Sequence, residues 1–64
     1  MLNLSNKKVL VVGAGISGFS AAKIAKKLGA AVTLSDAKAE KDIQEDFAPL
    51  REAGIALVFG PQAA

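Results

Sequence analysis

Three glycines between an apolar run and a helical pattern constrain this sequence more than any other feature. Gly13, Gly15 and Gly18 form a G-x-G-x-x-G pattern that directly follows Val9–Val12. In a strand-to-helix context, the first glycine permits a tight turn and the second lets a diphosphate approach the backbone. The third lets the helix pack closely on the strand. Because N–H groups at a helix start attract phosphate oxygens, the pattern predicts a diphosphate-binding loop.

The segments around this loop alternate between strand and helix patterns. Val9–Val12 is a continuous β-branched and aliphatic run, which predicts a strand buried on both faces. From Ser17 to Leu28 the spacing is helical, and Gly29 ends the helix. Ala31–Ser35 predicts a second strand, which Asp36 closes. The predicted sheet-facing side of the helix consists of Gly18, Ala21, Ala22, Ala25 and Leu28.

A more charged stretch, Ala39–Ala53, connects the second strand to a third. It is compatible with a helix except at Pro49, because a proline inside a helix removes a hydrogen bond and clashes with the preceding turn. We therefore expect a break near Phe47–Ala48 that gives two short helices. Gly54 ends the stretch, and Ile55–Phe59 predicts the third strand.

Strands that alternate with helices predict an α/β fold with a parallel sheet. Right-handed crossovers place the strands in the order 3-2-1 with both helices on one face, which is a partial Rossmann-like β-α-β-α-β unit of a three-layer fold. This order leaves Val9–Val12 at an edge and the other sheet face bare, which natural proteins avoid. We therefore expect residues 1–64 to be the N-terminal part of a larger parallel sheet.

Composition excludes several classes of function. The chain has 64 residues, of which 52% are hydrophobic, and its eight basic and six acidic residues nearly balance, so no nucleic-acid partner is predicted. It has no cysteine and no histidine, which excludes zinc binding and His-based acid–base catalysis, and we predict no metal site and no catalytic residue in this chain. No apolar run reaches the ~20 residues that span a membrane, and residues 1–6 do not resemble a signal peptide. We expect a cytoplasmic protein without membrane insertion.

Side chains beside the loop are candidates for ligand contacts. Ser17 is placed to bind a phosphate oxygen or to act as a simple helix N-cap. Asp36 stands where Rossmann folds place the acid that meets ribose hydroxyls, and its charge disfavours NADP. Lys38 is placed to cover a base or to balance a phosphate charge, although Asp36 and Lys38 are also compatible with solvated loop positions. Phe19 falls outside the sheet-facing arc, so we expect it to contact the N-terminal segment or an absent domain.

Three stretches of the chain resemble the N-terminal domain of the Mur ligase family. They are Lys8–Gly18, Val32–Lys38 and Gly54–Gly60, and they cover nearly the whole sequence. In that family the domain resembles a Rossmann fold but binds the UDP part of a UDP-linked muramoyl substrate. By position, the resemblance implies a UDP site formed by Gly13, Gly15, Ile16, Ser17, Gly18, Asp36, Ala37, Lys38 and Gly60.

The resemblance also implies individual roles. Ile16 and Ser17 would lie against the uracil and the diphosphate, Asp36 and Lys38 would meet the uracil, and Gly60 would approach the diphosphate from the third strand. Ala37 departs from relatives that have a threonine at this position, so one hydrogen bond to the base that those relatives make is not expected here.

The parent enzyme that this resemblance implies is a ligase of peptidoglycan biosynthesis that adds D-glutamate, and so serves the cell wall, cell shape and cell division. It would use ATP and magnesium to make an acyl phosphate, which the amine of D-glutamate attacks. Those steps belong to central ATP-binding and C-terminal ligase domains. The sequence has no G-x-x-x-x-G-K-[ST] loop, so we expect this chain to anchor the substrate and to hold no cofactor.

Other interpretations of the glycine loop stay open, since the loop alone does not separate UDP from FAD or NAD. Val12–Ala22 is also very like the FAD fingerprint of flavin oxidoreductases, although those usually continue with a glutamate and a glycine pair after the second strand. Here Asp36 is followed by no glycine until Gly54. An NAD-dependent dehydrogenase is supported by Asp36. A regulatory nucleotide sensor on the same half-fold is the fourth alternative.

Overall fold

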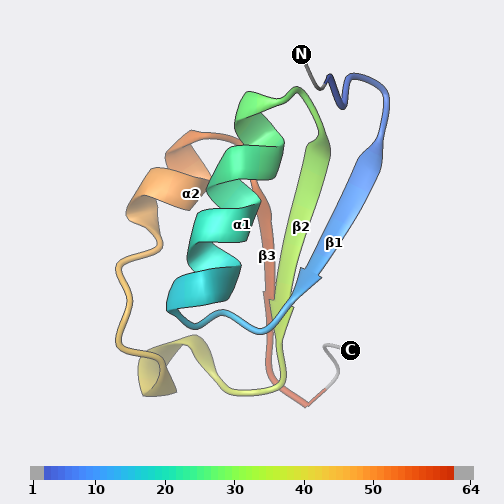
Figure 1. Ribbon diagram of the computed structural model, residues 1–64. Helices are drawn as coiled ribbons and strands as arrows, with labels where there is room; N and C mark the ends of the chain where they lie inside the picture. The colour runs from blue at the N-terminus through green and yellow to red at the C-terminus, as the bar shows by residue number, and fades with distance from the viewer. Residues whose placement is uncertain (1–2, 62–64) are drawn as a thin grey trace.

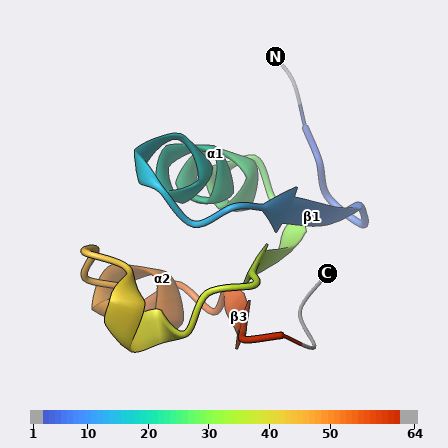
Figure 2. The ribbon, with the colours of Figure 1, turned by 90° about the horizontal axis from the view of Figure 1, so that it is seen from below.

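The computed structural model describes residues 3–61, and its strands and helices alternate along the chain (Figure 1). The strands form one parallel sheet in the order β1-β2-β3, which is the predicted 3-2-1 order seen from the other edge. Both helices lie on the same side of this sheet (Figures 1 and 2). The partial Rossmann-like α/β fold is therefore confirmed. Its elements are β1 (Lys8–Val12), α1 (Ile16–Lys27), β2 (Ala31–Asp36), the 3-10 helix η1 (Glu40–Asp42), α2 (Ala48–Glu52) and β3 (Ala56–Phe59).

The core lies between the sheet and the helices. Leu34 of β2 and Leu50 of α2 are fully buried, and Phe47 lies just before α2 with almost no exposed surface. The ring centroid of Phe47 lies 6.0 Å from that of Phe19 and 5.1 Å from that of Phe59. Aromatic rings at such distances contact each other favourably. We expected Phe19 to contact the N-terminal segment or an absent domain. It instead packs on the second crossover, the segment 37–55 that connects β2 to β3.

The second crossover is divided, as Pro49 predicts. η1 and α2 are two short helices, and residues 43–47 between them are not helical. Pro49 lies in the first turn of α2, where a backbone N–H has no partner within the helix, so its missing donor costs nothing there. A hydrogen-bonded ion pair between Glu40 and Arg51 connects the two helices at the surface.

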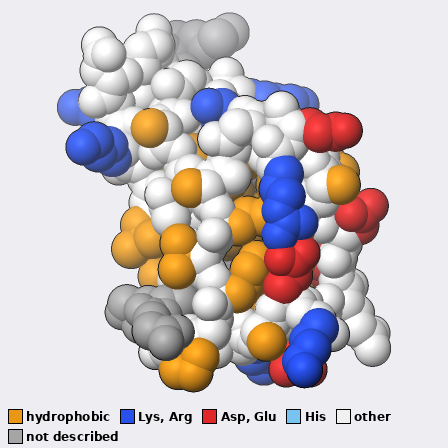
Figure 3. All heavy atoms as spheres, turned by 180° about the vertical axis from the view of Figure 1, so that it is seen from behind, with side chains coloured by type: hydrophobic (Ala, Val, Ile, Leu, Met, Phe, Trp, Pro, Cys, Tyr) orange, Lys and Arg blue, Asp and Glu red, His pale blue; other side chains and the backbone are white. Residues whose placement is uncertain are grey.

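The prediction that Val9–Val12 is buried on both faces is wrong for this chain. Leu10 is 62% exposed and Val12 is 71% exposed, because both helices cover the opposite face of the sheet. Val58 of β3 adds to this uncovered face, where hydrophobic side chains gather in the space-filling view (Figure 3). Ala21 is also exposed, contrary to its predicted sheet-facing position, because Ala22 and Ala25 centre the buried arc and leave Ala21 at its rim.

Candidate functional site

The carboxyl ends of the three strands lie at one edge of the sheet, and Figure 2 looks onto this edge. Three loops gather there: the glycine loop after β1, the segment 36–38 at the end of β2, and Gly60 after β3. Ligands of open α/β sheets bind outside this edge. The structure thus brings the predicted site residues to one end of the molecule.

The glycine loop turns sharply and packs tightly against its own helix. Gly13 has a φ of +101°, a conformation that favours glycine, and its N–H donates a hydrogen bond to the carbonyl oxygen of Ser35 at 2.7 Å. A Cβ on Gly18 would lie only 1.7 Å from the carbonyl oxygen of Gly13. The structural roles predicted for Gly13 and Gly18 are confirmed.

Gly15 differs from Gly18 because its surroundings are open, and from Gly13 because its φ is an ordinary −73°. A Cβ at this position would meet no atom within 4 Å. The loop therefore leaves free space next to the Gly15 backbone, which is where the sequence pattern places a diphosphate. That ligand contact stays a prediction.

The start of α1 has donors that no side chain caps. Gly15 is the N-cap residue, no side-chain hydrogen bond is made there, and the first turn holds no acidic residue. In an α-helix the N–H groups of the first turn, here those of Ile16, Ser17 and Gly18, have no partner within the helix. Ile16 is 78% exposed and Ser17 is exposed as well. Ser17 lies inside the first turn, so the alternative that it is the N-cap is wrong.

The carboxylate of Asp36 joins two of the loops. Its Oδ2 accepts a hydrogen bond from the N–H of Ala14 at 2.8 Å, and its Oδ1 accepts one from the N–H of Lys38, also at 2.8 Å. The N–H of Lys38 is the main cause that lowers the pKa of Asp36 below its ordinary value of 3.8; the N–H of Ala14 also lowers it, and burial opposes the shift. Asp36 is therefore a charged acceptor at neutral pH.

The third loop, at Gly60, is hydrogen-bonded to the segment 36–38. The N–H of Gly60 donates to the carbonyl oxygens of Asp36 at 3.0 Å and of Lys38 at 3.1 Å, and Gly60 is buried. The side chains of Ala37 and Lys38 are exposed. Ala14, whose N–H binds Asp36, was not among the residues predicted from the sequence. Its position between Gly13 and Gly15, in the loop expected to face the acid at the end of the second strand, is the sequence feature that could have indicated this role.

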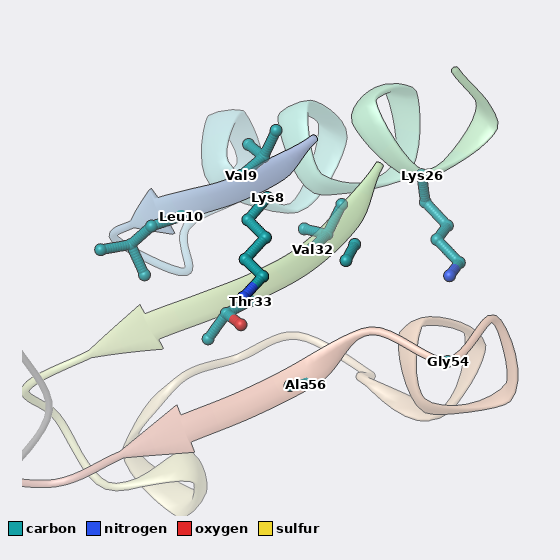
Figure 4. A pocket seen from close by; sticks show the side chains of 9 residues that line it. Lys8, Val9, Leu10, Lys26, Val32, Thr33, Gly54 and Ala56 are labelled. Atoms are coloured by element: carbon teal, nitrogen blue, oxygen red, sulfur yellow. The ribbon is translucent and has the colours of Figure 1, made fainter. Parts of the chain in front are cut away.

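A hollow lies elsewhere on the molecule, toward the amino ends of the strands (Figure 4). Lys26 extends toward Gly54, where a Cβ would lie 3.7 Å from the Lys26 Nζ. None of the predicted UDP-site residues lines this hollow, so it is separate from the candidate site. Its lining consists of Lys8, Val9, Leu10, Lys26, Ala31, Val32, Thr33, Gly54 and Ala56.

Two kinds of feature are absent from residues 3–61. No helix in this part of the chain is long and apolar enough to cross a membrane. The same residues contain no group of three or more acidic, histidine or cysteine side chains arranged to hold a metal ion.

Comparison with known proteins supports the family resemblance. A family model described as alanine dehydrogenase/PNT, C-terminal domain, matches residues 2–52. The UDP-N-acetylmuramoylalanine–D-glutamate ligase of Acidobacterium capsulatum is 44% identical over 59 residues, which are 92% of this chain and 13% of that ligase. The ligase of the same name from Staphylococcus aureus strain MW2 is 48% identical over 65 aligned residues, which are 94% of this chain and 14% of that ligase.

This chain therefore spans only 13–14% of the length of these curated relatives. No solved structure matches it. The family model covers more than half of the chain, and its match agrees with the β-α-β-α-β sheet and the glycine loop. The chain belongs to the Rossmann-type family that this model describes, and its resemblance to the Mur ligases is confirmed by homologues at 44–48% identity.

Proposed function

We propose that this chain anchors the UDP moiety of UDP-N-acetylmuramoyl-L-alanine as the N-terminal part of a peptidoglycan-precursor ligase. The observation that carries the proposal is the uncapped start of α1, with open space at Gly15, next to the Asp36–Lys38 segment. The printed names of the homologous ligases supply the substrate class.

The diphosphate would lie on the first turn of α1. The N–H groups of Ile16, Ser17 and Gly18 together offer hydrogen bonds to an anion, and the dipole of the 12-residue helix adds positive potential at the same point. The exposed hydroxyl of Ser17 supplies a further donor. Because the first turn holds no acidic residue, no side-chain charge on it repels the phosphates.

The uracil would lie beside the segment 36–38. A uracil edge has one N–H donor between two carbonyl acceptors, so it requires both an acceptor and donors from the protein. The carboxylate oxygens of Asp36 each keep a second lone pair after binding the N–H groups of Ala14 and Lys38. The exposed ammonium of Lys38 supplies donors. These two side chains therefore match the chemistry of the base.

The parent enzyme would add D-glutamate with ATP and magnesium, in the cytoplasm, for cell-wall synthesis. The sequence has no G-x-x-x-x-G-K-[ST] loop, the pattern that cradles nucleotide phosphates and positions magnesium in P-loop enzymes. We therefore assign ATP and magnesium to other domains of the parent. The role of this chain is to bind and orient the nucleotide end of the substrate.

A nicotinamide dinucleotide is the second candidate ligand. The match to the alanine dehydrogenase/PNT family model favours it, as does an acid at the end of β2. Both candidates share the diphosphate, so the glycine loop alone does not decide between them. The two ligands differ in their base and ribose groups, which would lie beside the segment after β2.

Amide chemical shifts of the labelled chain, titrated separately with UDP, NAD and FAD, test the proposal. We expect saturable shifts at Gly15, Ser17, Asp36 and Gly60 with UDP alone. A response to NAD or FAD together with no response to UDP would overturn the proposal and make the chain part of an oxidoreductase.

A matched pair of variants tests whether the ligand lies on the glycine loop. Gly15→Val adds a side chain in open space at an ordinary backbone φ of −73°, so the fold should persist while the diphosphate approach is blocked. We expect UDP affinity to fall at least tenfold, about 1.4 kcal/mol. Ala56→Val adds similar bulk at an exposed position on the uncovered face and should leave affinity unchanged. Equal affinity in all three proteins would move the diphosphate away from Gly15.

A further inference from the structure

Asp36 is connected to the glycine loop in a way that its expected contact with the base does not require. One carboxylate oxygen accepts the N–H of Ala14, 22 residues earlier in the chain, and the other accepts the N–H of Lys38. Both contacts exist in the protein alone. The carboxylate therefore has a role before any ligand binds.

We propose that Asp36 is the positioning residue of the diphosphate site, because it holds the glycine loop and the base-facing segment in one fixed arrangement. The inference rests on the proposed function and deepens it. In this arrangement the Ala14 N–H is used inside the protein, while the N–H groups of the first turn of α1 stay free for the ligand.

The geometry around Asp36 extends this connection to the third strand. The N–H of Gly60 binds the carbonyl oxygens of both Asp36 and Lys38, so the segment 36–38 is joined to the loops that follow β1 and β3. Ala14 is fully buried, so an Ala14 N–H without an acceptor would be costly. One carboxylate thus sets the distance between the phosphate-binding and the base-binding halves of the site.

An amide does not replace this carboxylate. Asparagine has a single acceptor oxygen, and its NH₂ group would face one of the two backbone N–H groups that Asp36 now binds. Asp36→Asn therefore leaves Ala14 or Lys38 without its partner. Asp42→Asn is the matched control, because Asp42 is an exposed residue of η1 outside the site.

Three probes separate positioning from direct contact with the base: inorganic pyrophosphate, uridine and UDP, each titrated into the original chain and both variants. If Asp36 positions the loop, Asp36→Asn weakens pyrophosphate about tenfold or more, as expected for hydrogen bonds to a charged group, and weakens UDP by at least the same factor, while Asp42→Asn changes neither. If Asp36→Asn weakens uridine and UDP and leaves pyrophosphate unchanged, the proposal is overturned in favour of base contact.

The same probes distinguish failure of this inference from failure of the proposed function. An original chain that binds pyrophosphate but not UDP contradicts the UDP proposal, while weakening of pyrophosphate by Asp36→Asn still supports positioning. An original chain that does not bind pyrophosphate overturns the positioning of a diphosphate site.

A measurement on the original chain keeps the inference testable if Asp36→Asn does not fold. The amide protons of Ala14 and Lys38 should shift together with the Asp36 carboxyl carbon as the pH falls from 7 through the lowered pKa. Within the described residues, Lys38 is the charged side chain whose charge lowers the pKa of Asp36. Residues 13–18 and 60–61, in the two neighbouring loops, carry no titratable side chain. The amide of Ala48, held by Asp46, serves as an unrelated reference. An Ala14 amide that does not follow Asp36 would refute the link.

Discussion

Replacing Gly18 with alanine should strongly destabilise the chain, although the change raises intrinsic helix propensity by about 1 kcal/mol. The added Cβ would lie 1.7 Å from the Gly13 carbonyl oxygen and 2.9 Å from its carbon, against a practical minimum of 3.0 Å. Both obstructing atoms belong to the backbone, so no side chain can rotate away. The N-terminal turn of α1 would have to move by more than 1 Å, which loosens the contact of Ala22 and Ala25 with the sheet.

The size of this effect follows from overpacking combined with partial loss of that contact. Overpacking costs ~1–3 kcal/mol, and we expect a net loss of about 3 kcal/mol. In a domain of this size each kcal/mol lowers the melting temperature by about 4–8 °C, so the expected decrease is about 12 °C or more. Gly15→Ala is the comparison, since its Cβ meets nothing and its φ is −73°. Its N-cap cost and its gain in unfolded-state entropy should cancel to within about 1 kcal/mol.

Thermal and urea unfolding of the three proteins, followed by circular dichroism, measures both effects. The reasoning fails if Gly18→Ala is as stable as the original chain, because then the close approach of α1 to the loop does not exist. It also fails if Gly15→Ala is the less stable of the two variants, because then the open space at Gly15 is filled.

Three further outcomes can be measured on the same chain. Leu34→Ala should lower the free energy of unfolding by about 2–5 kcal/mol because Leu34 is fully buried, whereas Leu10→Ala on the uncovered face should cost under about 1 kcal/mol; equal losses in urea unfolding would contradict the assigned core. The pKa of Asp36 is lowered in the folded protein, so its contribution to stability is complete above its unfolded pKa near 3.8 and is lost as the pH falls through the folded pKa. The melting temperature should therefore decline as the pH falls from 5 to 2, and it should decline less steeply in Asp36→Asn. Glu40→Gln should leave the melting temperature nearly unchanged in 1 M NaCl, because its ion pair with Arg51 is exposed; a large decrease at that salt concentration would show that the pair holds the second crossover.

Local patterns predicted the features of the fold that depend on backbone geometry. Gly13 and Gly18 could be assigned because a tight turn and a close helix approach each exclude a side chain. Pro49 located the break in the second crossover because it excludes a helix interior. The strand order followed from the handedness of crossovers, which depends on no particular side chain.

Features that depend on distant partners were not predictable in the same way. The apolar run Val9–Val12 matches a strand with neighbours on both faces, yet helices cover only one face in this chain. The contact of Phe19 with Phe47 joins α1 to an irregular segment whose path no periodicity describes. At the site, residue spacing located Asp36, but the pairing of its carboxylate with Ala14 depends on how two loops meet in space.

The aromatic cluster of Phe19, Phe47 and Phe59 has a consequence for the order of folding events. Its three rings come from α1, from the end of the irregular crossover and from β3, so no short stretch of the chain can assemble it alone. Closing such long loops costs conformational entropy, and this cost arises before the contacts that offset it have formed. The cluster should therefore form late, and shortening the Phe47 side chain should accelerate unfolding far more than it slows folding.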